Sequence, residues 1–226
     1  MDVAGTRALV EAAHEAGVGR LVYLSHLGAD RASAYPVLKA KGLAEEFIRH
    51  SGLAHTILRA ALLYGEEDVF VNVIAAMLRL GPGVFFMPGD GKVTLQPLWV
   101  EDLVTCLEWS LSDLTSLNQT ISLGGPEFLT FAQMVEIVRD VIGVRRFVVP
   151  VRPPALRFGA WMLEGLLPRS PLTTRWLDYL ATNRTWELVS VSRYFGLKPA
   201  RFGPRTLEYL RQKRWLSEMA RLIFGT

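Results

Sequence analysis

Three side chains near the start of the chain have the types and the spacing of a proton-transfer site. Ser25 ends a short apolar run, and ten residues later Tyr35 and Lys39 form a Tyr-x-x-x-Lys pattern. On a helix that opens at Tyr35, Lys39 lies one turn further along the same face, so both side chains point to one site. An ammonium group beside a phenol favours the phenolate, which lets tyrosine exchange a proton with a substrate oxygen. A nearby serine hydroxyl would hold that oxygen.

The Tyr-x-x-x-Lys pattern alone is weak evidence for a site, because short patterns also arise by chance. The predicted secondary structure around it gives stronger evidence. The apolar spacing predicts a helix over residues 2–16, a short strand over 21–24, a second helix over 35–50 and a second strand over 55–59. Alternation of this kind is typical of a parallel sheet covered on both faces. Open sheets of this class bind ligands at the carboxyl ends of their strands, which is where Ser25 is expected.

The pattern loosens further along the chain. A turn at 88–91 separates two short apolar stretches, which predicts a small excursion on the substrate side of the site. Thr130 and Gln133 have the spacing of a capping box at the start of another helix. We therefore expect an α/β domain over residues 1–149, followed by a mainly helical region over 150–226.

Four runs carry a resemblance to a known family. They are similar, in order and over nearly the whole chain, to blocks of the short-chain dehydrogenase/reductase superfamily. More narrowly, they resemble its atypical NAD(P)H-binding branch, which contains NmrA-like proteins and an accessory nucleotide-binding subunit of respiratory complex I. The resemblance implies the C-terminal portion of a Rossmann-type parallel sheet. The four runs are GTRALVEAAHEAGVGRLVYLSHLGAD, AYPVLKAKGLAEEFIRHSGLAHTILRAALLYGEEDVFVN, QPLWVEDLV and SLGGPEFLTFAQMVEIV.

The resemblance also implies roles for individual residues. By position, Ser25, Tyr35 and Lys39 would be the catalytic set, and Tyr35 and Lys39 would also bind NAD or NADP. Ala60 and Leu62 would lie along the nicotinamide, in a segment whose usual Arg-Pro is Arg-Ala here. The glycine-rich loop that binds the pyrophosphate in this family is not found in residues 1–226, so we expect weak affinity for the nucleotide.

Three functions remain open at this point. The first is an oxidoreductase that moves a hydride between a nicotinamide nucleotide and a carbonyl or hydroxyl group of an unknown small molecule. The second is an accessory or scaffold subunit of the complex I type, in which the nucleotide is structural. The third is an inactive truncated remnant. The four histidines and single cysteine, Cys106, lack the spacing of a metal site, and the sequence has no recognised DNA-binding motif.

Two surfaces are predicted to meet partners. The strand over 21–24 has no predicted neighbour on one side, and an open sheet edge can pair with another protein. Residues 205–224 interleave arginines with large apolar residues, which is typical of an amphipathic helix that contacts a membrane surface, or of a terminal helix packed on its own domain. Because no secretion signal precedes Asp2, we expect a cytoplasmic location, with peripheral contact at the inner membrane surface.

Overall fold

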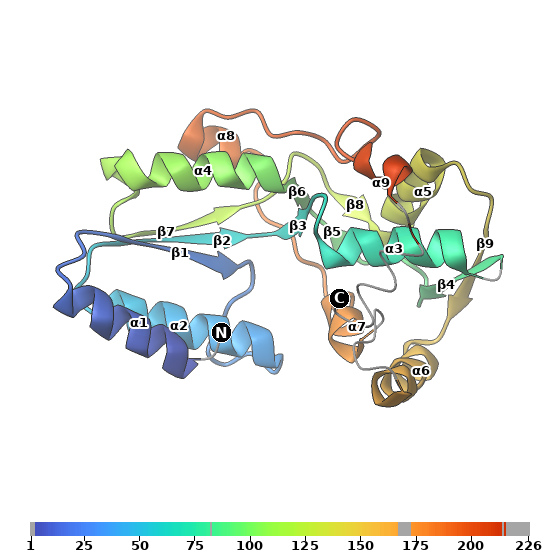
Figure 1. Ribbon diagram of the computed structural model, residues 1–226, viewed down its shortest axis with the longest axis horizontal. Helices are drawn as coiled ribbons and strands as arrows, with labels where there is room; N and C mark the ends of the chain where they lie inside the picture. The colour runs from blue at the N-terminus through green and yellow to red at the C-terminus, as the bar shows by residue number, and fades with distance from the viewer. Residues whose placement is uncertain (1–2, 82, 167–172, 214, 216–226) are drawn as a thin grey trace.

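The computed structural model describes the chain except for residues 1–2, 82, 167–172, 214 and 216–226. Its central element is a parallel three-stranded sheet with the strand order β1-β2-β7. Helices α1 and α2 cover one face of this sheet, and α4 with α8 covers the other (Figure 1). The elements of this layered part are α1 (Val3–Glu15), β1 (Leu21–His26), α2 (Pro36–His50), β2 (His55–Ala60), α4 (Val100–Ser112), η1 (Leu114–Ser116), β7 (Gln119–Leu123) and α8 (Ser190–Phe195). The predicted α/β fold with a partial parallel sheet is thus confirmed.

The rest of the described chain is built on three two-stranded sheets. The β3–β6 and β4–β9 pairs are parallel, and the β5–β8 pair is antiparallel. No helix among the described residues has the length and apolar character needed to cross a bilayer. The elements of this part are β3 (Leu62–Tyr64), α3 (Val69–Leu80), β4 (Val84–Pro88), β5 (Thr94–Leu95), β6 (Pro97–Trp99), β8 (Leu129–Thr130), α5 (Phe131–Ile142), β9 (Phe147–Val151), α6 (Pro153–Leu166), α7 (Thr174–Tyr179) and α9 (Tyr209–Gln212).

Local signals in the sequence account for several element boundaries. Thr130 and Gln133 form the reciprocal capping box of α5, which ends at a left-handed Gly143. Pro36 occupies the first turn of α2, so Tyr35 is the N-cap residue rather than the first helical residue. That one-residue difference matters, because the extended backbone of an N-cap aims its side chain differently from a helical one.

Two large apolar clusters hold these parts together. One packs the sheet against α4 and α8, and includes Leu58, Cys106 and Val191. The larger one lies around α3 and α5 and also takes in Trp176, so it includes residues on both sides of position 150. The division into domains at that position stays a prediction.

The basic C-terminal segment lies only partly within the described residues. Leu207, Leu210 and Trp215 are buried in the larger apolar cluster, as expected for a terminal segment packed on its own domain. Residues 214 and 216–226 of the predicted membrane-contacting helix lie outside the described residues.

Candidate functional site

Ser25 sits near the carboxyl end of β1, as predicted, but its hydroxyl points at a carboxylate. Its Oγ donates a hydrogen bond of 2.5 Å to Oε1 of Glu45, which projects from α2. Ser25 is 4 % exposed and Glu45 is fully buried. A serine that orients a substrate oxygen needs a hydroxyl that faces the substrate, whereas this one is engaged inside the α2–sheet interface.

Glu45 is the centre of a buried polar network. Arg59 on β2 donates to both of its carboxylate oxygens, from Nε at 2.9 and 3.1 Å and from Nη2 at 2.6 Å. Arg49, one helical turn further along α2, adds a bond of 3.1 Å. Burial would raise the pKa of Glu45, but the hydrogen bonds from Arg59 and Ser25 outweigh it, and the pKa is lowered. The carboxylate is therefore ionised at neutral pH and stabilised by a matched set of donors.

Strand register explains why these residues meet. Ser25 on β1 and Arg59 on β2 are partners in the parallel ladder, so their side chains lie side by side on the face that α2 covers. Sequence reasoning missed Glu45, although an acidic residue among buried positions of an amphipathic helix indicates a paired charge.

Tyr35 and Lys39 take no part in the hydrogen bond that engages Ser25. Within the described residues, no hydrogen bond or ion pair joins the side chains of these three residues. Lys39 is exposed and Tyr35 is half-buried at the start of α2. The Tyr-x-x-x-Lys spacing is present, with Tyr35 as the N-cap residue of α2 and Lys39 within the helix. The catalytic roles of Ser25, Tyr35 and Lys39 stay a prediction.

Lys41 is the lysine that lies against the sheet. Its Nζ donates to the carbonyl oxygen of Leu24 at 2.8 Å and sits 4.8 Å from the centroid of the Tyr23 ring. Burial lowers the pKa of Lys41, and the neighbouring Glu45 opposes that shift. The four-residue spacing of Lys41 and Glu45, which places both on the face of α2 toward the sheet, was the available sequence signal.

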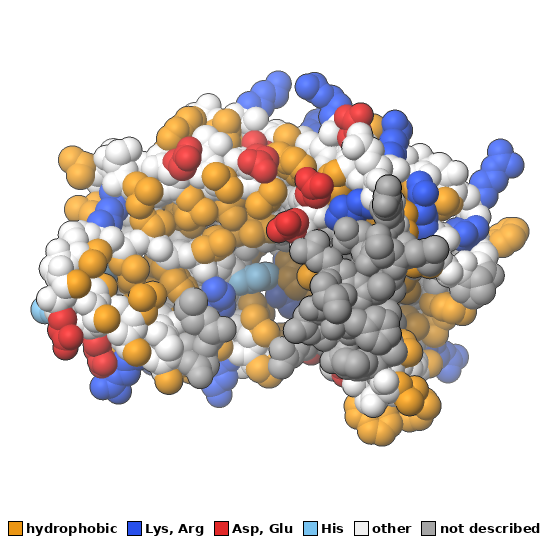
Figure 2. All heavy atoms as spheres, in the orientation of Figure 1, with side chains coloured by type: hydrophobic (Ala, Val, Ile, Leu, Met, Phe, Trp, Pro, Cys, Tyr) orange, Lys and Arg blue, Asp and Glu red, His pale blue; other side chains and the backbone are white. Residues whose placement is uncertain are grey.

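A pocket opens where the strands of the parallel sheet end. It has a volume of about 440 Å³ and lies between the segment after β1, the start of α2 and the segment 182–186. Figure 2 shows a hollow beside the part of the molecule built on β1, β2 and β7. The lining includes Tyr35, but neither Ser25 nor Lys39. The lining residues are Leu27, Gly28, Asp30, Ser33, Tyr35, Leu38, Arg59, Ser122, Thr182, Asn183, Arg184, Thr185 and Trp186.

Ala60 and Leu62, the predicted neighbours of the nicotinamide, lie at the same edge of the sheet but beneath the surface. They are 2 % and 5 % exposed. The carbonyl oxygen of Ala60 accepts a hydrogen bond of 2.8 Å from the backbone of Leu27, which ties the segment after β1 to the end of β2. Neither residue is among those that line the pocket, and their contact with a cofactor stays a prediction.

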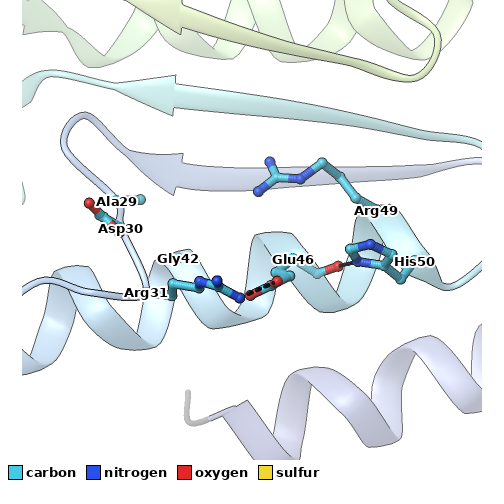
Figure 3. A pocket seen from close by; sticks show the side chains of 7 residues that line it. All are labelled: Ala29, Asp30, Arg31, Gly42, Glu46, Arg49 and His50. Carbon is cyan, nitrogen blue, oxygen red and sulfur yellow. Dashed lines mark hydrogen bonds and ion pairs between the residues drawn. The ribbon is translucent and has the colours of Figure 1, made fainter.

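A second pocket, smaller at about 260 Å³, lies between α2 and the loop that precedes it. Figure 3 shows Arg31 from the preceding loop pointing toward Glu46, with which it forms an ion pair of 2.8 Å. The loop approaches α2 at Gly42, where an added Cβ atom would come within 2.4 Å of the backbone nitrogen of Arg31. Glycine at this helical position therefore allows the loop that borders both pockets to pack against α2.

Comparisons with known proteins relate this chain to nucleotide-binding proteins. Residues 2–79 match a family model described as NAD(P)H-binding. The chain is 28 % identical over 222 residues to the mitochondrial NADH dehydrogenase [ubiquinone] 1 alpha subcomplex subunit 9 of Mus musculus, and 33 % identical over 141 residues to that of Arabidopsis thaliana. Residues 2–79 thus carry an NAD(P)H-binding domain, and the chain is homologous to these subunits. The mouse alignment covers 93 % of the chain and 57 % of the relative, and the plant alignment 62 % and 35 %.

Solved structures show the same fold. An NADPH-dependent quinone oxidoreductase from Escherichia coli superposes with a TM-score of 0.72 at 18 % identity, covering 90 % of this chain and 72 % of that one. A dTDP-glucose 4,6-dehydratase from Streptomyces venezuelae with NAD bound gives a TM-score of 0.66 at 21 % identity, covering 94 % and 66 %. The predicted Rossmann-type, epimerase/dehydratase-like fold is confirmed.

One prediction is wrong. The chain was expected to be cytoplasmic, with peripheral contact at the inner membrane surface, but the curated relatives named above are mitochondrial proteins. The error has a physical reason, because a globular domain has the same core composition in either compartment. The cellular location of a protein is determined by targeting segments and not by its fold.

Proposed function

We propose that this chain is a nucleotide-binding accessory protein in which NAD(P)H has a structural role. In this proposal the residues needed for hydride transfer are not arranged as a catalytic site. The observation that carries the proposal is the hydrogen bond from Ser25 to the buried Glu45, whose carboxylate also accepts bonds from Arg59. The hydroxyl that should orient a substrate is a member of a structural ion-pair network. The homology to subunits of NADH dehydrogenase [ubiquinone] supports an accessory role.

The pocket at the sheet edge fits the nicotinamide end of the nucleotide. Its volume of about 440 Å³ falls within the range of small-molecule sites. The hydroxyls of Ser33, Ser122 and Thr182 and the amide of Asn183 offer partners for a ribose and a carboxamide. A bound nicotinamide would donate or accept the hydride in any reaction, and the chain's own residues would hold the ring and exclude water.

The proposed protein partner meets the sheet at β1. Within the described residues, β1 pairs only with β2, and most of its residues are half-exposed, whereas those of β2 are mostly buried. Its other side offers backbone donors and acceptors to an added strand. We extend to this chain the assembly into an NADH dehydrogenase that the names of its relatives state.

The test separates binding from turnover. NADH and NADPH are titrated against the chain by calorimetry, and hydride transfer to a panel of aldehydes, ketones and quinones is followed by the absorbance of the reduced nicotinamide. We expect binding without turnover. Because Glu45 holds Ser25 as a structural residue, Ser25→Ala should lower the urea midpoint and leave nucleotide affinity unchanged. Nucleotide-dependent reduction of any of these substrates would contradict the accessory role.

A second candidate, the oxidoreductase, is favoured by one observation: Tyr35 lines the pocket at the carboxyl edge. If Tyr35 is the acid/base, Tyr35→Phe should lower hydride transfer by about 10²–10⁴-fold and leave nucleotide affinity unchanged. The matched control is Tyr194→Phe on α8, which is exposed and outside the pocket. Equal turnover in both variants would exclude this role for Tyr35.

A further inference from the structure

Arg184 is a buried cation with unused hydrogen-bonding capacity. It is 9 % exposed, and its Nε is buried with no hydrogen-bond partner. Its Nη2 makes only a long contact, 3.4 Å, with the carbonyl oxygen of Asp178. A guanidinium group carries five donors in a fixed fork, and burying such a charge without a counter-ion is costly. The side chain nevertheless lines the pocket at the sheet edge.

The protein holds this cation in a fixed position. The backbone nitrogen of Arg184 donates to the carbonyl oxygen of Thr94 at 3.1 Å, and Thr94 in turn donates to the side chain of Asn183 at 2.9 Å. The guanidinium carbon lies 4.5 Å from the ring centroid of Tyr179 and 5.8 Å from that of Tyr35. The two rings stabilise the charge by cation–π contacts but occupy none of its in-plane donors.

No carboxylate among the described residues pairs with Arg184. The nearest acidic side chains in sequence, Glu187 and Asp178, form ion pairs with other arginines, at 2.6 Å with Arg193 and at 2.7 Å with Arg157. Asp30 lines the same pocket and accepts a bond of 2.8 Å from the backbone of Ala32. The positive charge of Arg184 acts on a neighbouring residue, because burial lowers the pKa of His26 and the charge of Arg184 lowers it further. The charge of Arg184 is thus left for a group from outside the described chain.

We propose that Arg184 binds an oxyanion, a phosphate or a carboxylate, carried by a small molecule that enters this pocket. A planar guanidinium with free donors matches the geometry of both groups. The hydroxyls of Ser122, Thr182 and Thr185 in the same lining add donors for the remaining oxygens. The inference goes beyond the proposed function, because an oxyanion without nicotinamide is enough to test it.

The test uses inorganic pyrophosphate as the probe. Calorimetric titration of the chain at low salt is compared with Arg184→Gln and with a matched control, Arg193→Gln, in which the lost arginine is exposed and paired with Glu187. Removing a charged donor to an anion is expected to weaken binding by about 10- to 100-fold in Arg184→Gln. The Arg193→Gln variant should bind as the unaltered chain does. Arg184→Lys keeps the charge but not the fork, so it serves as the second variant and should weaken binding less.

Two results would overturn the proposal. One is that the unaltered chain fails to bind pyrophosphate at millimolar concentration. The other is that Arg184→Gln, or Arg184→Lys should the first variant not fold, binds it as tightly as Arg193→Gln. Competition with NADH then identifies the source of the anion. Displacement of pyrophosphate by NADH would mean that Arg184 binds a phosphate of the nucleotide, and simultaneous binding would mean a separate anionic ligand.

Discussion

Replacing Glu45 by glutamine would test the network that holds α2 on the sheet. The substitution keeps the size of the side chain and removes its charge, so Arg59 loses its carboxylate partner in a buried site. Breaking a buried ion pair from one side costs about 3–5 kcal/mol. The matched control is the adjacent Glu46→Gln, whose partner Arg31 is 67 % exposed, and for a surface pair the cost is about 0–1 kcal/mol.

Urea unfolding at pH 7 measures the difference. With an m-value of about 2 kcal/mol/M, Glu45→Gln should lower the midpoint by about 1.5–2.5 M, and Glu46→Gln by less than about 0.5 M. The pKa of Glu45 is lowered in the folded chain, so its contribution is present above the ordinary carboxyl pKa and is lost as the pH falls through the folded value. The gap between the unaltered chain and Glu45→Gln should therefore narrow in acid. Equal midpoint shifts for the two variants would refute the reasoning.

Two further predictions concern stability. Gly42→Ala should destabilise the chain by about 1–3 kcal/mol, since the added methyl meets loop backbone. Gly159→Ala in α6 places its methyl in open space and should stabilise the chain by up to about 1 kcal/mol. Thermal unfolding checks this, because the two variants should shift the melting temperature in opposite directions. Burial raises the pKa of Asp68 to about 6 from an ordinary 3.8, so the folded chain loses about 2 kcal/mol of stability as the pH rises from 4 to 7. Asp68→Asn keeps the N-cap acceptor of α3 and should remove this loss, and unchanged pH dependence of the urea midpoint would contradict the assignment.

The sequence was sufficient for the layered part of the fold because its signals there are local and agree with one another. Apolar runs bounded by glycine marked β1 and β2, and outside the layered part the capping box at Thr130 marked the start of α5. The three two-stranded sheets were harder to predict, since strands of two or three residues such as β5 and β8 carry too little periodicity. Their pairing depends on residues far apart in the chain.

The catalytic and cofactor-binding roles predicted for the candidate site stay predictions, and the contacts of its residues depend on register and packing that the sequence does not display. Ser25 was placed at the right edge of the sheet, and the parallel register that sets it beside Arg59 cannot be read from either strand alone. Tyr35 was expected to be the first helical residue and is the N-cap residue instead, because sequence patterns locate a helix boundary only to within one or two residues. Arg184 gave no local signal, because its burial arises from packing between a distant segment and β5.

Among the described residues, β1 has one side without a paired strand, and this edge also affects how the chain behaves among its own copies. Strand Leu21–His26 contains no proline and no lysine, the residues with which natural sheets discourage strand-to-strand addition. Its first four residues, Leu21-Val22-Tyr23-Leu24, are apolar and strand-forming. Such an edge can pair with a strand of a second copy of the chain as well as with a strand of another protein. The solubility of the chain would then depend on its concentration and on the presence of a binding partner more than on the stability of the fold. Co-expression with such a partner would then raise the yield of soluble chain, whether or not it changes any activity.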